Sequence, residues 1–395
     1  MNIKLKQWSI CMMTVGLLTT SSMALATWGH DDDDDDYDRN SLTVCERSAN
    51  KMLRSCRNEV KEEYLAVTAM CINLGDAEAR EECFDEARIA RKEDKELCGD
   101  QREARNNVCE ILMEDRYDPE AFLDPDNFVE DPDDTNPYFS LEPGHTHVLR
   151  GTGGEEEEIV VVTVTDEVLP LFTEDEDGNP VDGVNCRLVV DIVLEVDDEG
   201  EYEAVEVTDD YYAQAKNGDV HYCGEVARNF EDGLLVDLDG SFLAGRDLAK
   251  SGVLIKYEPA SGDAHRQEFL LGEAEDVIRY VAGVTEETSP GEDEGGENLN
   301  FLCAGNCVKT EEFIPPEPDA GEYKYFIAGT GFVLGVALEL DEDDVLAPTG
   351  EREELLCTGD SLEVLSESAC GIGDEEKVVE LLGQLCDLSA AFCED

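Results

Sequence analysis

The chain has 395 residues, of which 97 are Asp or Glu and 29 are Lys or Arg, so its formal net charge is −68. This charge excludes binding to nucleic acid backbones as a main function. The acidic excess is uneven, because residues 42–116 carry 13 basic and 18 acidic residues whereas residues 117–395 carry 13 and 72. The first interpretation of the excess is a solvated surface, and the second is low-affinity binding of divalent cations, with Ca²⁺ as the candidate.

The N-terminus has the pattern of a secretory signal peptide. Lys4 and Lys6 precede an apolar stretch over residues 8–18 and then Ala24-Leu25-Ala26, which predicts residues 1–26 as a signal peptide. The apolar stretch is too short to span a bilayer. We expect residues 27–41, which include an acidic run over residues 30–38, to form a disordered tail. The mature protein is therefore predicted to be periplasmic or extracellular, with no membrane span.

Fourteen cysteines remain after removal of Cys11 with the signal peptide, which predicts up to seven disulfides in an exported chain. Six of them lie in residues 42–116, a Pro-free segment whose composition is helical. Two antiparallel helices bring together residues whose numbers have a constant sum. The six cysteines form three pairs whose residue numbers each sum to 154. Gly75 and Asp76 supply the turn between the helices. The predicted bridges of this α-hairpin are Cys45–Cys109, Cys56–Cys98 and Cys71–Cys83. A metal site is disfavoured because the segment lacks a Cys-x-x-Cys pair.

Residues 117–135, rich in Asp and Pro, are interpreted as a linker, and residues 136–341 as an antiparallel β domain. No helix-length segments separate the early strands, which disfavours parallel pairing. The domain is therefore a meander that forms a half-barrel, a closed barrel or a sandwich, and the whole chain is α+β. The expected strands are 159–165, 186–196, 203–208, 210–215, 220–227, 252–257, 265–271, 276–284, 307–313, 322–328 and 331–339.

Several stretches of the β domain resemble secreted bacterial proteins with a TapB-like or lipocalin-like β domain. These stretches include Asn136–Gly144, Gly218–Glu225, Gly272–Asp276 and Tyr323–Gly331. The resemblance covers about half of the chain and implies an antiparallel β fold rather than a particular chemistry. The chain departs from the pattern at Cys223, where an aromatic residue is expected, and in the acidic insertion 286–300.

Residues 342–395 are predicted to form a small C-terminal cysteine-rich helical segment with an amphipathic helix over residues 375–392. Within one helix, Cys386 and Cys393 would lie about 10.5 Å apart at Cα, beyond the roughly 7 Å that a disulfide spans. Both are therefore expected to pair with earlier cysteines. The favoured pairs are Cys370–Cys386 and Cys357–Cys393, with the swapped pairing allowed. The short loop favours Cys303–Cys307, which leaves Cys186–Cys223 as a bridge between strands.

Candidate metal ligands are four histidines. His145 and His147 lie two residues apart on an expected strand, so both rings share one face, and His221 and His265 lie on other β segments. Together they are candidates for a zinc or copper site, the alternative being four incidental histidines on a sheet. The sequence Gly359-Asp-Ser-Leu362 matches an esterase motif, which we reject because no histidine follows His265.

The leading functional interpretation is a secreted or periplasmic, non-enzymatic binding protein. Its β domain would hold a small apolar ligand or an envelope protein, and its acidic surface would take up calcium. The first alternative is a His-based metalloprotein or hydrolase of the cell envelope. The second alternative is a structural component of the cell surface.

Overall fold

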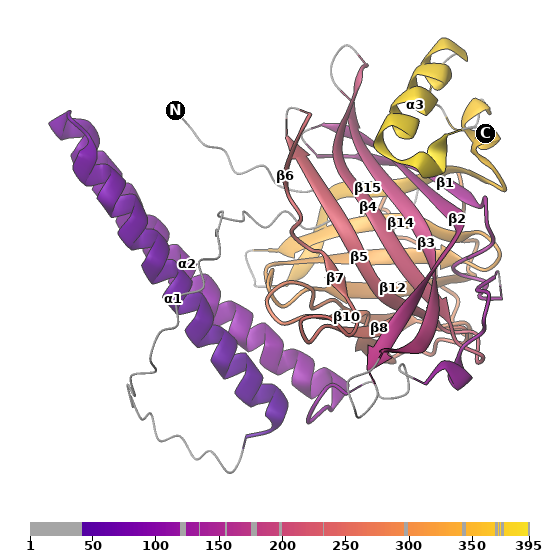
Figure 1. Ribbon diagram of the computed structural model, residues 1–395, viewed down its shortest axis with the longest axis horizontal. Coiled ribbons are helices and arrows are strands. Elements are labelled where there is room, and N and C mark those ends of the chain that lie inside the picture. Colours follow the sequence, from indigo (N-terminus) through magenta and orange to yellow (C-terminus); the bar gives the residue numbers. More distant parts are fainter. Residues whose placement is uncertain are drawn as a thin grey trace. The chain divides into compact units, whose positions relative to one another are not determined.

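The α-hairpin expected for residues 42–116 is present in the computed structural model (Figure 1). The structure describes residues 42–118, 124–133, 135–154, 156–174, 180–196, 200–231, 233–295, 299–341, 345–367, 370, 372 and 375–393. The predicted signal peptide, the acidic tail and the turn at 175–179 lie outside these residues. The chain divides into two compact units, a helical one that ends at Tyr117 and a β unit that begins at Asp118.

The helical unit consists of α1 (Val44–Asn73) and α2 (Ala77–Leu112). Asp76 caps α2 by accepting hydrogen bonds from the backbone N–H groups of Glu78 and Ala79, so the predicted turn is confirmed. The three disulfides are those of the constant-sum rule, with Cα–Cα distances of 6.0, 5.8 and 5.6 Å for Cys45–Cys109, Cys56–Cys98 and Cys71–Cys83. The bridges fix the register of the two helices along their whole length.

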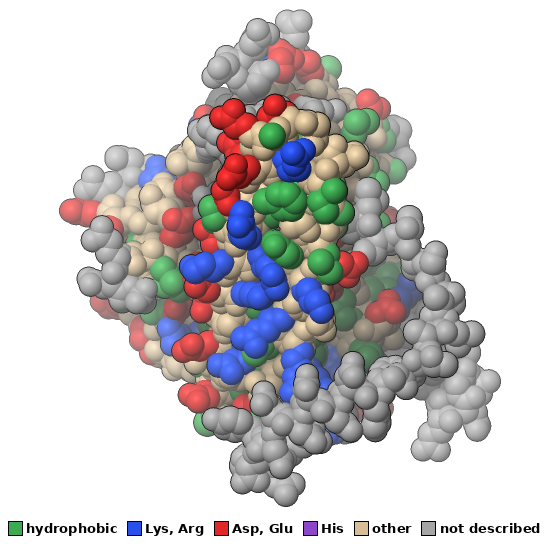
Figure 2. Space-filling view, turned by 90° about the vertical axis from the view of Figure 1, so that its left-hand side faces the viewer, with side chains coloured by type: hydrophobic (Ala, Val, Ile, Leu, Met, Phe, Trp, Pro, Cys, Tyr) green, Lys and Arg blue, Asp and Glu red, His purple; other side chains and the backbone are tan. Residues whose placement is uncertain are grey.

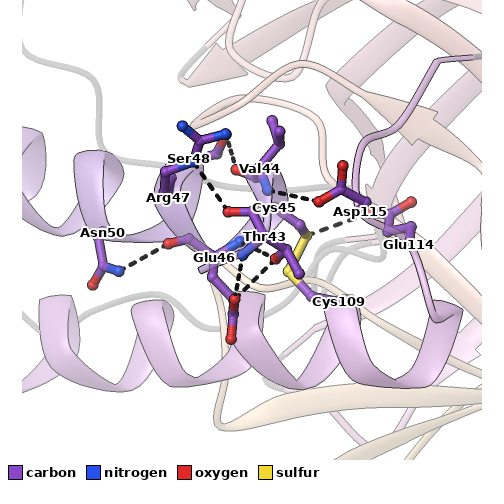
Figure 3. The surroundings of a disulfide bond; sticks show 10 residues. All are labelled: Thr43, Val44, Cys45, Glu46, Arg47, Ser48, Asn50, Cys109, Glu114 and Asp115. Atoms are coloured by element: carbon purple, nitrogen blue, oxygen red, sulfur yellow. Dashed lines mark hydrogen bonds between the residues drawn. A yellow bond between two sulfur atoms is a disulfide. The ribbon is translucent and has the colours of Figure 1, made fainter. Parts of the chain in front are cut away.

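Figure 3 shows the open end of the hairpin, where a disulfide and a helix cap meet. Thr43 and Glu46 form a capping box at the start of α1. Beside it, the backbone N–H of Cys45 donates to the carbonyl of Asp115 at 2.8 Å, and that of Val44 donates to the Asp115 carboxylate at 3.1 Å. The two ends of the hairpin are therefore joined by backbone hydrogen bonds as well as by Cys45–Cys109.

The β unit is one antiparallel sheet in the order β10-β8-β5-β4-β3-β2-β1-β15-β14-β13-β12-β11-β9, with β6 and β7 paired to β5. The strand Cys307–Phe313 has the predicted bounds, and the two expected strands 203–208 and 210–215 are one. The strands are β1 (Thr146–Thr152), β2 (Glu157–Glu174), β3 (Pro180–Val196), β4 (Tyr202–Gln214), β5 (Val220–Glu231), β6 (Leu234–Asp237), β7 (Phe242–Leu243), β8 (Lys250–Ile255), β9 (Ala264–Arg266), β10 (Glu268–Phe269), β11 (Val277–Ala282), β12 (Cys307–Phe313), β13 (Ala320–Ile327), β14 (Gly331–Leu340) and β15 (Leu346–Gly359).

The sheet curls into a nearly closed barrel because one short segment belongs to both of its edges (Figure 1). β9 pairs with β11, β10 pairs with β8, and Gln267 lies between them in the chain. The Gln267 side chain also donates to the carbonyl of Leu254, next to the end of β8, at 3.2 Å. At Gly252 a Cβ atom would lie 2.2 Å from the Arg266 carbonyl oxygen, so closure here requires glycine. Among the forms left open by the sequence, the barrel is the one observed.

Residues 124–133 pack against the barrel, although the sequence indicates a linker there. Phe128 is buried and forms an isolated β-bridge with Ala215. The buried guanidinium of Arg187 donates to the Asp131 carboxylate at 2.5 Å and to the Pro132 carbonyl at 2.9 Å. The Pro and Asp content predicted a linker, but burial of the Phe128 ring and of the Arg187 guanidinium fixes this segment.

The C-terminal segment differs most from the expectation. Residues 346–359 form β15, which pairs with β1 and β14, and α3 is confined to Glu375–Leu388. The run Glu351–Leu355 has helical propensity, but strand pairing on both sides overrides it. The apolar faces of α3 and of the 3₁₀ turn Leu362–Ser366 cover the outer surface of β1–β4. That cluster includes Val148, Val190, Ile192, Leu381 and Leu385.

The two predicted C-terminal disulfide pairs, Cys357–Cys393 and Cys370–Cys386, are wrong. The structure has Cys357–Cys370 and Cys386–Cys393 instead. α3 ends at Leu388, and Ser389 begins a separate 3₁₀ turn that brings Cys393 back to 4.6 Å from Cys386 at Cα. The prediction failed because it extended the helix to residue 392. Cys186–Cys223 and Cys303–Cys307 are present as predicted.

Candidate functional site: the acidic barrel interior

The strands β3, β4 and β5 place acidic side chains on the inner face of the barrel. Side chains alternate between the two faces of a strand, so residues 206, 208, 210 and 212 of β4 share one face. Asp210 is paired with Val189 of β3 and Glu225 of β5, and Thr208 with Asp191 of β3. Glu206, Asp210 and Glu225 are at most 8% exposed. One wall of the interior is therefore lined by carboxyl groups.

The opposite wall, formed by β12, β13 and β15, carries one ammonium group and further carboxyl groups. The Lys324 ammonium lies 2.8 Å from a Glu312 carboxylate oxygen and 3.3 Å from one of Glu322. Glu353 of β15 is 6% exposed and lies near Glu322 and Lys324. Lys324 is thus surrounded by three carboxyl groups.

The two walls interact across the barrel. The pKa of Asp191 on β3 is raised by burial and by Asp210, Glu206 and Glu353, and Lys324 on β13 lowers it. Four strands separate β3 from β13 in the sheet, so this interaction crosses the interior. We call the group the acidic interior, and its members are Asp191, Glu206, Asp210, Glu225, Glu268, Asp276, Glu312, Glu322, Glu353 and Lys324.

Burial and mutual repulsion hold several of these carboxyl groups near neutrality. Burial raises the pKa of Asp210 and of Asp276 to about 7 and, with repulsion from Glu322, that of Glu353 to about 8. Burial also raises the pKa of Glu225 and of Glu268 well above the usual range. At neutral pH the acidic interior therefore contains protons that it can exchange.

Four carboxyl groups of the acidic interior have a buried oxygen without a hydrogen-bond partner among the described residues. They are Asp191 Oδ1, Glu268 Oε1, Asp276 Oδ1 and Glu322 Oε1. Glu268 is 1% exposed, so its oxygen has no access to outside solvent. The Lys324 side chain nevertheless keeps 26% of its surface exposed. These acceptors lack donors among the described residues, and a donor-bearing ligand would supply them.

Aromatic rings border the acidic interior on the side of β4 and β5. Tyr212 and Tyr222 stack with their ring centroids 4.7 Å apart, and Phe139 packs edge-on against Tyr212 at 4.9 Å. The Tyr222 hydroxyl is hydrogen-bonded to the carboxyl groups of Asp210 and Glu225, the latter at 2.6 Å. Carboxylates and aromatic faces therefore lie together, which favours cations that also carry apolar groups.

The four candidate histidines lie in two pairs. His145 and His147 are in contact, with 2.8 Å between their Nε2 atoms, and His265 lies near His221. Within the described part of the chain, no group of three or more His, Cys, Asp or Glu side chains is placed to hold a metal ion. Burial lowers the pKa of His147 to about 3 and those of His221 and His265 to about 4, so these rings are neutral.

The esterase-like motif Gly359–Leu362 lies where β15 ends and a 3₁₀ turn begins. The Ser361 hydroxyl accepts a hydrogen bond from the Glu363 N–H and caps a 3₁₀ turn. This is a structural role at the end of β15.

Sequence reasoning missed the acidic interior itself. Acidic residues that alternate along a strand, such as Glu206 and Asp210, are normally assigned to the solvent face. The signal available in the sequence was that Val205 and Val207 alternate with these acidic residues. Apolar residues on one face of β4 imply that this face is buried, so the acidic residues on the other face had to be either exposed or buried inside the fold. The outer face is covered locally, as Val207 belongs to the cluster under α3.

Comparisons with known proteins add little to this geometry. No family model and no curated protein matches the chain. One solved structure, described as "a putative lipoprotein from Parabacteroides distasonis", aligns over 58% of this chain and 100% of its own length, with 12% identity and a TM-score of 0.24. A likeness this weak supports no argument. The resemblance to TapB-like or lipocalin-like proteins is therefore untested, although the antiparallel fold that it implied is observed. None of the described helices is both long and apolar enough to cross a membrane.

Proposed function

We propose that this protein is an exported, non-enzymatic binding protein whose barrel interior holds a small organic cation with an apolar part. The observation that carries the proposal is the acidic interior, in which nine carboxyl groups share the barrel with one lysine, Lys324, and four of them have unpartnered buried oxygens. Seven disulfides support a location outside the cytoplasm, where such bonds persist.

The physical reason is the cost of burying carboxyl groups without partners. A buried carboxylate is destabilising unless it is paired, and otherwise it takes up a proton. An ammonium group that donates to an unpartnered oxygen, such as Asp191 Oδ1 or Glu268 Oε1, would replace a proton and satisfy that oxygen. The ligand therefore differs from the small apolar one expected from sequence, because an alkyl group alone would leave the acceptors without donors.

An organic cation fits this interior better than a bare metal ion does. The carboxyl groups are spread over both walls, and the described residues contain no compact metal-binding group. The stacked pair Tyr212 and Tyr222 beside Asp210 offers apolar and cation–π contact to the rest of the ligand. Calcium uptake at the acidic outer surface stays a separate prediction.

Titration calorimetry with octylammonium, octanol and octanoate at pH 8 tests the proposal. We expect octylammonium to bind and the two matched analogues to bind at least tenfold more weakly. The variant Asp191→Asn with Glu268→Gln should lose this preference, whereas Glu203→Gln, an exposed carboxyl on β4, should keep it. Equal binding of octanol would instead support an apolar ligand, and the absence of any binding would contradict the proposal.

A further inference from the structure

The hairpin carries two rows of basic side chains, one on each helix. Arg54, Arg57 and Lys61 lie three and four residues apart on α1, and all three are exposed. On α2, Arg88, Arg91, Lys95 and Arg102 follow spacings of three, four and seven. Spacings of three, four and seven return to one side of a helix. Each helix therefore has a cationic row.

The two rows lie on the same side of the disulfide seam. The Arg91 guanidinium on α2 stacks on the ring of Tyr64, which follows Lys61 by three residues on α1, at 4.5 Å from the ring centroid. Arg88 and Tyr64 also line one shallow hollow near the hairpin turn. Figure 2 shows Lys and Arg side chains gathered along this side of the molecule. We call Arg54, Arg57, Lys61, Arg88, Arg91, Lys95 and Arg102 the cationic face.

Ion pairs occur on the hairpin at Arg88–Asp85 and Lys92–Glu96, but most of the cationic face lies outside them. On the other side of the seam, Glu63 and Glu93 lie close to Asp94, and burial together with their repulsion raises its pKa. Of the seven cations of the cationic face, Arg88 alone has an ion pair within the described residues, with Asp85. Like charges this close repel one another, so the face is stabilised by an anionic occupant.

The chain contains a matching anionic segment next to the hairpin. Asp31–Asp36 is a run of six aspartates that lies outside the described residues and ends seven residues before Val44, the first residue of α1. Those seven residues span up to about 25 Å when extended. Arg54 lies ten residues into α1, about 15 Å along the helix axis. The run can therefore reach the cationic face.

We propose that Asp31–Asp36 binds the cationic face of the hairpin in the same molecule. Tethering gives the run a local concentration in the millimolar range, which a free polyanion would have to match. A second copy of the chain is disfavoured as the occupant because two molecules of net charge −68 repel each other at low ionic strength. The bound run neutralises the one strongly basic surface of the hairpin.

Zero-length carbodiimide crosslinking of the full chain tests this inference, since it joins Asp carboxyls to Lys amines in contact. Peptide mass spectrometry should find crosslinks from Asp31–Asp36 to Lys61 and Lys95 in the monomer at low salt. Molar salt, with a Debye length of about 3 Å, should reduce them severalfold. The variant Arg54→Gln with Arg57→Gln keeps both lysines and should also lose crosslinks severalfold.

The matched control is Arg116→Gln with Arg246→Gln, two exposed arginines outside the cationic face, which changes the net charge equally. It should leave the crosslink yield unchanged. Equal yields in the two double variants would overturn the inference. So would crosslinks found only between two molecules, or the absence of Asp–Lys crosslinks at low salt.

Discussion

The substitution Glu353→Gln should stabilise the β unit, and more so at pH 7 than at pH 5. Glu353 is 6% exposed, and burial and Glu322 raise its pKa from 4.5 to about 8. Between these two values the folded state holds a proton that the unfolded state has released, so stability falls as pH rises through this window. Gln keeps the shape of the protonated side chain and does not titrate.

The magnitude follows from the pKa shift. Keeping Glu353 protonated costs about 1 kcal/mol at pH 5 and about 2–3 kcal/mol at pH 7, and the Gln variant is relieved of both. Three histidines with lowered pKa values have the opposite effect, because their protonation destabilises the folded protein as the pH falls below 6.5. They affect wild type and variant alike.

Urea unfolding followed by the β-sheet circular dichroism signal, with disulfides intact, measures the difference at both pH values. Glu203→Gln is the control, because this exposed residue on the same sheet should change stability by less than about 0.5 kcal/mol. The reasoning would be refuted by a Glu353→Gln variant that is less stable than wild type at pH 7. It would also be refuted if the difference in unfolding free energy between variant and wild type were the same at pH 5 and pH 7.

Gly252→Ala should destabilise the β unit by about 3 kcal/mol or more, since its Cβ would lie 2.2 Å from the Arg266 carbonyl oxygen, and an unchanged melting temperature would show that the barrel is not closed there. Replacing Cys186 and Cys223 with Ala should cost about 3–4 kcal/mol by the loop-entropy relation for a separation of 37 residues, measured by urea unfolding, and a cost near zero would contradict the bridge. Raising the salt concentration from very low to molar should raise the melting temperature, because it screens the self-repulsion of a chain of net charge −68, and a constant melting temperature would contradict this.

The parts of the fold that were predictable are those set by local geometry. The six cysteines of the hairpin pair by a constant sum because two antiparallel helices bring few other cysteine pairs within bonding distance. Strand β12 begins at Cys307 and ends at Phe313, as the alternation of its residues indicated. The C-terminal piece was not predictable in this way. β15 is a strand because β1 and β14 pair with it. The residues of β15 themselves do not reveal that these two strands will be its neighbours.

The candidate site was the least predictable feature. The acidic interior depends on barrel closure, which places Asp191 of β3 opposite Lys324 of β13 although 133 residues separate them in sequence. Charge composition alone assigned these carboxyl groups to the surface. Conversely, the four histidines attracted attention as ligands, but the fold places them as two partly buried pairs.

Calorimetry of octylammonium binding in two buffers with different ionisation enthalpies tests the central claim most directly, because it counts the protons that leave the protein. If the ammonium group replaces protons on the acidic interior, binding at pH 7 should release close to one proton, and the affinity should rise from pH 6 to pH 8 as Asp210 and Asp276 ionise. Binding without proton release, or with an affinity that is independent of pH, would show that the ligand does not contact these carboxyl groups.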